Sequence, residues 1–282
     1  MKEKVTLKIQ GTEIREFEMY LYERENAEAT IRKYITDLKC FFSFLGGDQE
    51  VDKPRLLSYK EWLLEHYAVN SVNSMLAALN QFLIFCGYCE LKIRRVKTQK
   101  NLFLQEEKEL TRKEYKRLVQ TARAEGKAQL ALCIETIAVT GIRVSELKNL
   151  TVEQVKKRRI ELHNKGKYLR IFLTRSIRKK LLIYAAARKI RSGCIFVTKN
   201  GKPKDRSNLW SEMKALKEKA GVSGEKIFPH NLRHLFARVY YQTTKDLTGL
   251  ADVLGHSSLN VTRIYTSNTG ALYQSQLDRM TV

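Results

Sequence analysis

Proline is scarce in this sequence, with three residues among 282, and glycine contributes only fourteen. Fibrous and low-complexity chains are rich in one or both, so those classes are excluded. No stretch approaches the roughly 18 apolar residues that a membrane-spanning helix needs, and Met1–Val5 begins no apolar signal segment. We therefore expect a folded, cytoplasmic protein, and 282 residues suggest two domains.

Metal-binding patterns are also lacking. The five cysteines are odd in number, and Cys86 and Cys89 have the spacing of a CxxC pair. No second Cys or His pair completes a zinc site, so we interpret the cysteines as thiols of a reducing compartment. No metal or other cofactor is expected.

Acidic residues are few, with 30 against 52 lysines and arginines, which gives a net charge of +22. The excess lies almost entirely in residues 101–282, which carry 36 basic and 16 acidic residues, against 16 and 14 in residues 1–100. Residues 156–191 contain fourteen basic residues and one acid, Glu161. Such a charge usually serves to meet a polyanion. We expect a nucleic acid partner, with a membrane surface as the alternative.

Apolar residues recur at spacings of three and four over 31–45 and 76–86 and predict two helices, each followed by glycine. With shorter helices near 12–23 and 55–66, residues 1–91 are predicted to form a four-helix domain.

Residues 92–108 are polar and basic without periodicity, which predicts a linker. Thr111 and Glu114 have the spacing of a capping box and open a second domain, residues 109–282. Apolar residues alternate over 159–174 around Asn-Lys-Gly, which predicts a β-hairpin. The fold is therefore expected to be mostly α with a small hairpin. Further helices are predicted near 175–190, 207–220, 229–243, 246–254 and 258–266.

Two pairs of polar residues have a spacing that suits chemistry. His230 and Arg233 are three residues apart on one predicted helix, on a face away from its core stripe. Arg143 follows a predicted helix break, and Glu146 comes one turn later, where a carboxylate can fix a guanidinium. Each pair alone is typical of an ordinary protein surface, so its significance depends on which other motifs the sequence contains.

Two further polar residues follow these pairs in the sequence. His256 is at the end of another predicted helix, and Tyr265 is on the short helix after it. In order along the chain, residues 140–147, Lys165, residues 230–234, His256 and Tyr265 resemble the sequence boxes of the tyrosine recombinase (phage integrase) family. The nearest resemblance is to small Xer-like integrases, and it extends from about residue 12 to residue 266.

The resemblance implies six catalytic residues and one supporting acid. They are Arg143, Lys165, His230, Arg233, His256 and the nucleophile Tyr265, with Glu146 supporting Arg143. Asn164 stands where the family commonly has glycine, and Lys167 is an alternative to Lys165. His234 is common in relatives and is a candidate structural residue.

The chemistry requires residues of these types. Two arginines can hold the oxygens of an anionic phosphodiester through bidentate donors, and losing one such donor typically costs about 2.7–4 kcal/mol of barrier. For a tyrosine with a pKa near 10, forming the phenolate at pH 7 costs about 4 kcal/mol. We expect the arginines and His230 to lower this cost. A lysine can protonate the departing 5′-oxygen.

The resemblance also implies the wider reaction. A helical, SAM-like core-binding domain and the catalytic domain would close on double-stranded DNA as a C-shaped clamp, at core sites with inverted repeats. A 3′-phosphotyrosyl intermediate would lead through a Holliday junction within a homotetramer, or beside a related recombinase. Residues 266–282 would dock on a neighbouring protomer, as in relatives, or alternatively pack on their own domain. Integration or excision of a bacterial mobile element is preferred over resolution of chromosome dimers.

Three alternatives remain open. A type IB topoisomerase shares the chemistry but relaxes supercoils without exchanging partners. A degenerate recombinase could serve as a DNA-binding regulator without activity, although the complete set of six residues argues against it. An RNA-binding protein is disfavoured because no aromatic stacking platform is evident.

Overall fold

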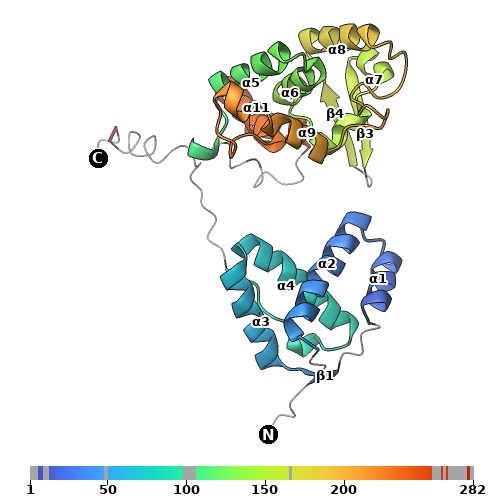
Figure 1. Ribbon diagram of the computed structural model, residues 1–282, viewed down its shortest axis with the longest axis vertical. Coiled ribbons are helices and arrows are strands. Elements are labelled where there is room, and N and C mark those ends of the chain that lie inside the picture. The colour runs from blue at the N-terminus through green and yellow to red at the C-terminus, as the bar shows by residue number, and fades with distance from the viewer. Residues whose placement is uncertain are drawn as a thin grey trace. The chain divides into compact units, whose positions relative to one another are not determined.

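The computed structural model describes residues 6–8, 13–47, 50–97, 106–164, 167–255, 262, 265 and 278–279. The chain divides into two compact units, residues 1–100 and 101–282 (Figure 1). Both are mostly helical, and the strands described form two-stranded pairs, as predicted for the fold class. Within the ranges given above, no helix is long and apolar enough to cross a bilayer.

The N-terminal unit contains the four predicted helices. They are α1 (Glu13–Glu23), α2 (Glu28–Leu45), α3 (Lys53–His66) and α4 (Val69–Phe85), followed by the 3₁₀ turn η1 (Cys89–Leu91). Their buried faces meet in an aromatic core that includes Phe17, Phe41, Tyr59 and Phe82. A short antiparallel pair, β1 (Leu7–Lys8) with β2 (Glu50–Val51), was not predicted.

Residues 92–97, which the sequence pattern assigns to the linker, pack along α4. Asn80 of α4 both donates to the Ile93 carbonyl and accepts from its N–H, at 2.8 Å each. Asn73 makes the same pair of bonds with Val96, at 3.0 and 2.8 Å. The two asparagines are seven residues apart and therefore share one face of the helix. This part of the chain belongs to the N-terminal unit.

The C-terminal unit holds the remaining elements. The helices are α5 (Arg112–Ala124), α6 (Ala128–Thr140), α7 (Val152–Lys156), α8 (Arg175–Ala187), α9 (Arg206–Lys214), α10 (Lys217–Ala220), α11 (Pro229–Thr244) and α12 (Leu247–Leu254), with the 3₁₀ turns η2 (Glu106–Lys108) and η3 (Val144–Asn149). The predicted capping box of Thr111 and Glu114 opens α5. One helix predicted over 207–220 is two, because Leu216 N bonds to Met213 O in a tight turn that buries Leu216.

The predicted hairpin is present. Strand β3 (Arg159–Asn164) pairs antiparallel with β4 (Lys167–Phe172), with Arg159 opposite Phe172 and Asn164 opposite Lys167. Lys165 and Gly166 of its turn lie outside the described residues. So does the helix predicted over 258–266, apart from Thr262 and Tyr265.

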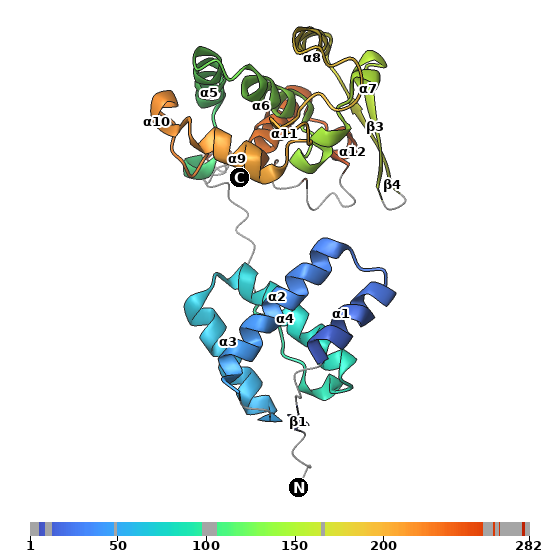
Figure 2. The same cartoon turned by 45° about the vertical axis from the view of Figure 1, so that its right-hand side comes forward.

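Helix α6 is the centre of the C-terminal unit. It contacts α5, α8, α9 and α11, with α5, α6 and α8 side by side in both views (Figures 1 and 2). Its buried Thr136 and Thr140 donate their hydroxyls to carbonyls four residues earlier, at 2.7 Å each. Glu135 is ion-paired with Arg123 at 2.8 Å and Lys180 at 2.7 Å. These contacts hold the C-terminal end of α6 in place, and with it the position of the residues that follow.

Candidate active site

Arg143 is held just after a tight turn that ends α6. Gly141 has φ +66°, and a Cβ there would lie 2.5 Å from Phe236 Cδ1, so only glycine fits. Arg143 then donates from Nη1 to Glu146 Oε1 at 2.9 Å, while its backbone N–H donates to Oε2 at 2.9 Å. The ion pair expected from the spacing is therefore present, and it fixes the direction of the guanidinium.

Arg233 is buried and joins two helix ends. Its guanidinium donates to the carbonyl of Gly141, at the end of α6, and to that of Leu254, at the end of α12, at 2.7 Å. Arg143 Nη2 donates to Gly255 O, also at the end of α12, at 3.4 Å. Helix C-termini concentrate partial negative charge, so these carbonyls stabilise the cations. The two arginines lie together although 90 residues separate them.

Two histidines on α11 stand beside these arginines. The rings of His230 and His234 have centroids 4.5 Å apart. Burial of its ring, with the influence of His234 and the positive charges of Arg233, Arg206 and Arg143, lowers the pKa of His230 to about 4. His230 keeps some solvent contact, which screens these charges. Because its pKa is lowered, the imidazole is neutral at pH 7. A neutral imidazole can accept a proton.

Tyr265 is 6% exposed and packs against Ala237, Leu250 and Leu254. Its ring stands edge to face with His234, with centroids 5.4 Å apart and planes at 90°. Burial raises the pKa of Tyr265, and Arg233 opposes that shift only in part. The arginines therefore favour phenolate, as expected, but desolvation of the buried phenol outweighs them.

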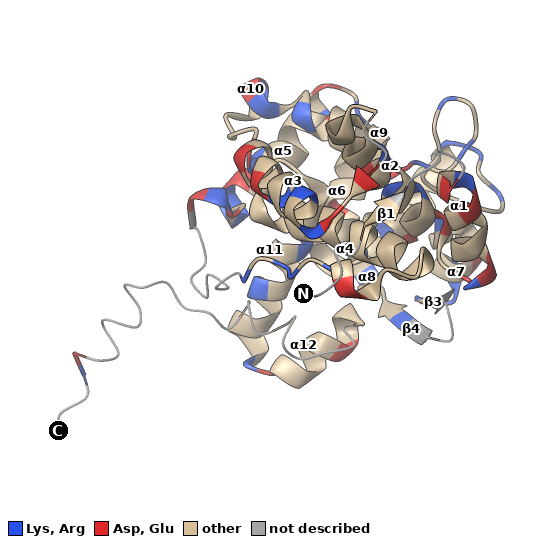
Figure 3. Cartoon of the chain, turned by 90° about the horizontal axis from the view of Figure 1, so that it is seen from below, with Lys and Arg blue, Asp and Glu red and all other residues tan. Residues whose placement is uncertain are grey.

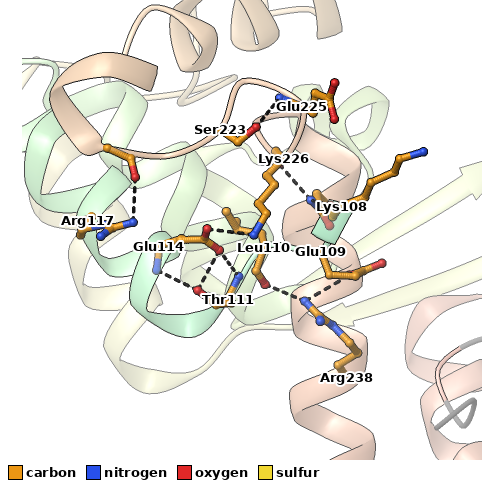
Figure 4. Close-up of polar contacts among 12 residues, drawn as sticks. Lys108, Glu109, Leu110, Thr111, Glu114, Arg117, Ser223, Glu225, Lys226 and Arg238 are labelled. Atoms are coloured by element: carbon orange, nitrogen blue, oxygen red, sulfur yellow. Dashed lines mark hydrogen bonds and ion pairs between the residues drawn. The ribbon is translucent and has the colours of Figure 1, made fainter. Parts of the chain in front are cut away.

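Glu109 and Arg238 belong to the same cluster and were missed by sequence reasoning. Glu109 Oε1 lies 3.5 Å from His234 Nδ1. Glu109 Oε2 lies 3.1 Å from Arg238 Nη2 (Figure 4). Burial would raise the pKa of Glu109, but the hydrogen bond with His234 and the charge of Arg238 lower it below its ordinary value. The only signal in the sequence is that Arg238 follows His234 by four residues on α11.

Lys165 and His256 lie outside the described residues, as does the side chain of Lys167. Gly255, just before His256, is the acceptor for Arg143.

In the parts of the chain that the structure describes, no three His, Cys, Asp or Glu side chains gather as a metal site. Lysines and arginines occur on α10, α11 and β4 of this unit (Figure 3).

The arrangement suits one kind of chemistry. Two fixed guanidinium groups can bind the oxygens of an anionic ester, and a phenol beside them can attack it. The neutral imidazole of His230 provides a proton acceptor at the same place.

The chain is similar to known proteins in both of its units. Residues 108–271 match the phage integrase family, and residues 14–86 match the phage integrase N-terminal SAM-like domain. The chain is 28% identical to tyrosine recombinase XerA of Pyrococcus furiosus over 272 residues, covering 94% of this chain and 93% of the relative. It is 30% identical to tyrosine recombinase XerC of Herpetosiphon aurantiacus over 298 residues, covering 96% of each.

Solved structures share the fold. A lambda integrase dimer bound to a COC′ core site matches with a TM-score of 0.74 at 19% identity, over 93% of this chain and 77% of that one. A XerH recombinase in a post-cleavage complex with difH matches with a TM-score of 0.70 at 21% identity, over 91% and 81%. Since the family match covers more than half of the sequence, the chain belongs to the phage integrase family and is a tyrosine-type site-specific recombinase.

Proposed function

We propose that Tyr265 is the nucleophile that cleaves and rejoins DNA. Its phenolic oxygen forms a bond to the scissile phosphorus as the bond to the 5′-oxygen breaks, which leaves a 3′-phosphotyrosyl link and a 5′-hydroxyl. The supporting observation is that Tyr265 packs between α11 and α12, where the charges of Arg233 and Arg143, two arginines fixed on helix ends, act on its phenol. The phosphodiester energy is kept in the covalent link, so rejoining needs no ATP.

The other residues take roles that follow from their chemistry. Arg143 and Arg233 bind the non-bridging oxygens, and Glu146 orients Arg143. His230 accepts the phenolic proton. We assign the 5′-oxygen proton to Lys165, and we place His256 at the phosphate.

The assembly is also part of the proposal. A lambda integrase tetramer bound to a Holliday junction shares this fold. We propose a homotetramer, or a pair with a related recombinase, on double-stranded DNA with inverted-repeat core sites. The core-binding domain, which includes residues 92–97 of the predicted linker, and the catalytic domain would form a C-shaped clamp. The cellular role proposed is integration or excision of a mobile element in the bacterial cytoplasm.

One experiment tests the nucleophile. Duplexes selected by binding from a randomised library are rebuilt as nicked suicide substrates, in which loss of a short strand traps the covalent adduct. Tyr265→Phe should bind the selected duplex as the unchanged chain does and form no adduct. Tyr241→Phe, which alters a tyrosine packed on the same small core, should still form it. Adduct from Tyr265→Phe would refute the assignment.

A further inference from the structure

Helix α11 uses a second face to hold the chain segment that opens the C-terminal unit. Asn231 Nδ2 donates to Lys108 O at 2.9 Å, and Arg238 Nη2 donates to Leu110 O at 2.6 Å. His234 lies between them on the helix and contacts Glu109. Because positions 231, 234 and 238 share one face, residues 108–110 are fixed along α11 (Figure 4).

Glu109 is the charged centre of this contact. Its side chain is 13% exposed and lies between His234 and Arg238. His234 in turn packs its ring against that of Tyr265. A carboxylate from the start of the unit therefore reaches the proposed nucleophile through one imidazole.

We propose that Glu109 is a positioning residue for Tyr265, acting through His234. The carboxylate limits rotation of the His234 ring by contacting Nδ1, and the ring limits where the phenol of Tyr265 can lie. A displacement of about 1 Å at a reacting group can cost roughly 10²-fold in rate, so such a restraint matters. This inference rests on the proposed role of Tyr265 as nucleophile.

Glu109 has a second, opposing effect through its charge. The charged groups that act on Tyr265 are Arg233, Arg238 and Arg143, which favour phenolate, and Glu109, which disfavours it. His234 is faced by Glu109, His230 and Tyr265. Removing only the charge of Glu109 should let the phenol ionise at lower pH, whereas removing the side chain should also release His234.

Two substitutions separate these effects in the full chain. Single-turnover adduct formation on the nicked duplex is followed from about pH 7 to 11 at saturating DNA, because burial raises the pKa of Tyr265 above its ordinary value near 10. Glu109→Gln keeps an acceptor for His234, so its maximal rate should stay within about threefold and its midpoint should fall by about half a pH unit or more. Glu109→Ala should lose roughly 10- to 100-fold in maximal rate while DNA affinity is unchanged.

Glu114→Gln is the matched control. Glu114 lies on the same segment, is 14% exposed and pairs with Lys226 at 3.0 Å, away from Tyr265. It should keep the normal rate and midpoint. If Glu114→Gln lost as much maximal rate as Glu109→Ala, or its midpoint fell as far as that of Glu109→Gln, the effect would reflect the stability of the whole segment. That result would refute the inference.

Other results are equally decisive. An unmoved midpoint in Glu109→Gln, or an unchanged maximal rate in folded Glu109→Ala, refutes the inference. Melting curves show whether Glu109→Ala folds, and if it does not, the midpoint of Glu109→Gln decides alone. If the unchanged chain forms no adduct on any selected duplex, the proposed function fails instead.

Discussion

Arg233 has a structural task besides its proposed one. It is 2% exposed, and its donors satisfy carbonyls at the ends of α6 and α12. Burial, with the charge of Arg143, lowers the pKa of Arg233 to about 10, which still leaves it charged at pH 7. Each buried carbonyl left without a partner costs about 1–3 kcal/mol. A loss of activity on substituting Arg233 would therefore combine the loss of a phosphate-binding group with the loss of hydrogen bonds at the ends of α6 and α12.

Gly141 offers a cleaner test of how the site is built. Gly141→Ala places a methyl 2.5 Å from Phe236 at φ +66°. We expect a loss of at least about 2 kcal/mol in unfolding free energy, from backbone strain and overpacking. Urea unfolding measures it. Gly126→Ala, at φ +69° with nothing within 4 Å of the added Cβ, should lose only the strain part. Equal losses would contradict the packing argument.

Lys165 is tested by its proposed proton transfer. A substrate with sulfur in place of the bridging 5′-oxygen expels a thiolate, which needs no protonation because its conjugate acid has a pKa of about 8.5. Lys165→Ala should be slow by roughly 10²–10⁴-fold on ordinary DNA and near normal on the sulfur substrate. Arg143→Ala should be impaired on both.

Lys167→Ala supplies the comparison for that test. Rescue of Lys167→Ala but not of Lys165→Ala would move the assignment by two residues. Rescue of neither would mean that the hairpin lysines bind phosphate and that the acid lies elsewhere.

Residues with partners nearby in sequence were predictable. Glu146 lies three positions from Arg143, and the spacing alone indicates their ion pair. Glu109 lies 125 positions before His234, and no local rule joins them. Its contact depends on how residues 108–110 pack along α11, which only the folded structure shows.

At the scale of elements, strong local signals predicted well. Pro229 suits the first turn of α11, and the apolar periodicity predicted both α11 and α12. No separate boundaries were predicted for α5 and α6, because α6 is apolar on almost all sides and has no amphipathic stripe. The break between α9 and α10 depends on burying Leu216, a tertiary effect that periodicity does not detect.

The cap of α12 should influence the reaction. Asp246 accepts from Gly249 N at 2.8 Å at the start of this eight-residue helix, whose far end binds both arginines. Asp246→Ala should cost about 1 kcal/mol of stability and slow adduct formation at saturating DNA. Asp52→Ala, which removes the equivalent cap of α3, should cost similar stability and leave the rate unchanged. Equal rates in both variants would mean that α12 does not tune the site.

At the scale of the molecule, charge is divided unequally. Residues 101–282 carry a net charge of +20, and residues 1–100 carry +2. If the chain contacts six to ten phosphates, its affinity for DNA should fall roughly 10³- to 10⁵-fold between about 50 and 200 mM salt. Fluorescence anisotropy at stepped salt concentrations measures the slope. A loss below roughly tenfold would contradict a phosphate-dominated interface.

The two faces of α11 also restrict how this gene can change. One face carries His230 and Arg233, and the next carries Asn231, His234 and Arg238. Each residue advances an α-helix by about 100°. A single codon inserted between Arg233 and His234 would keep every side chain yet turn His234 and Arg238 by about 100° relative to His230, Asn231 and Arg233. Among viable variants, α11 should therefore accept point substitutions long before it accepts any change in length.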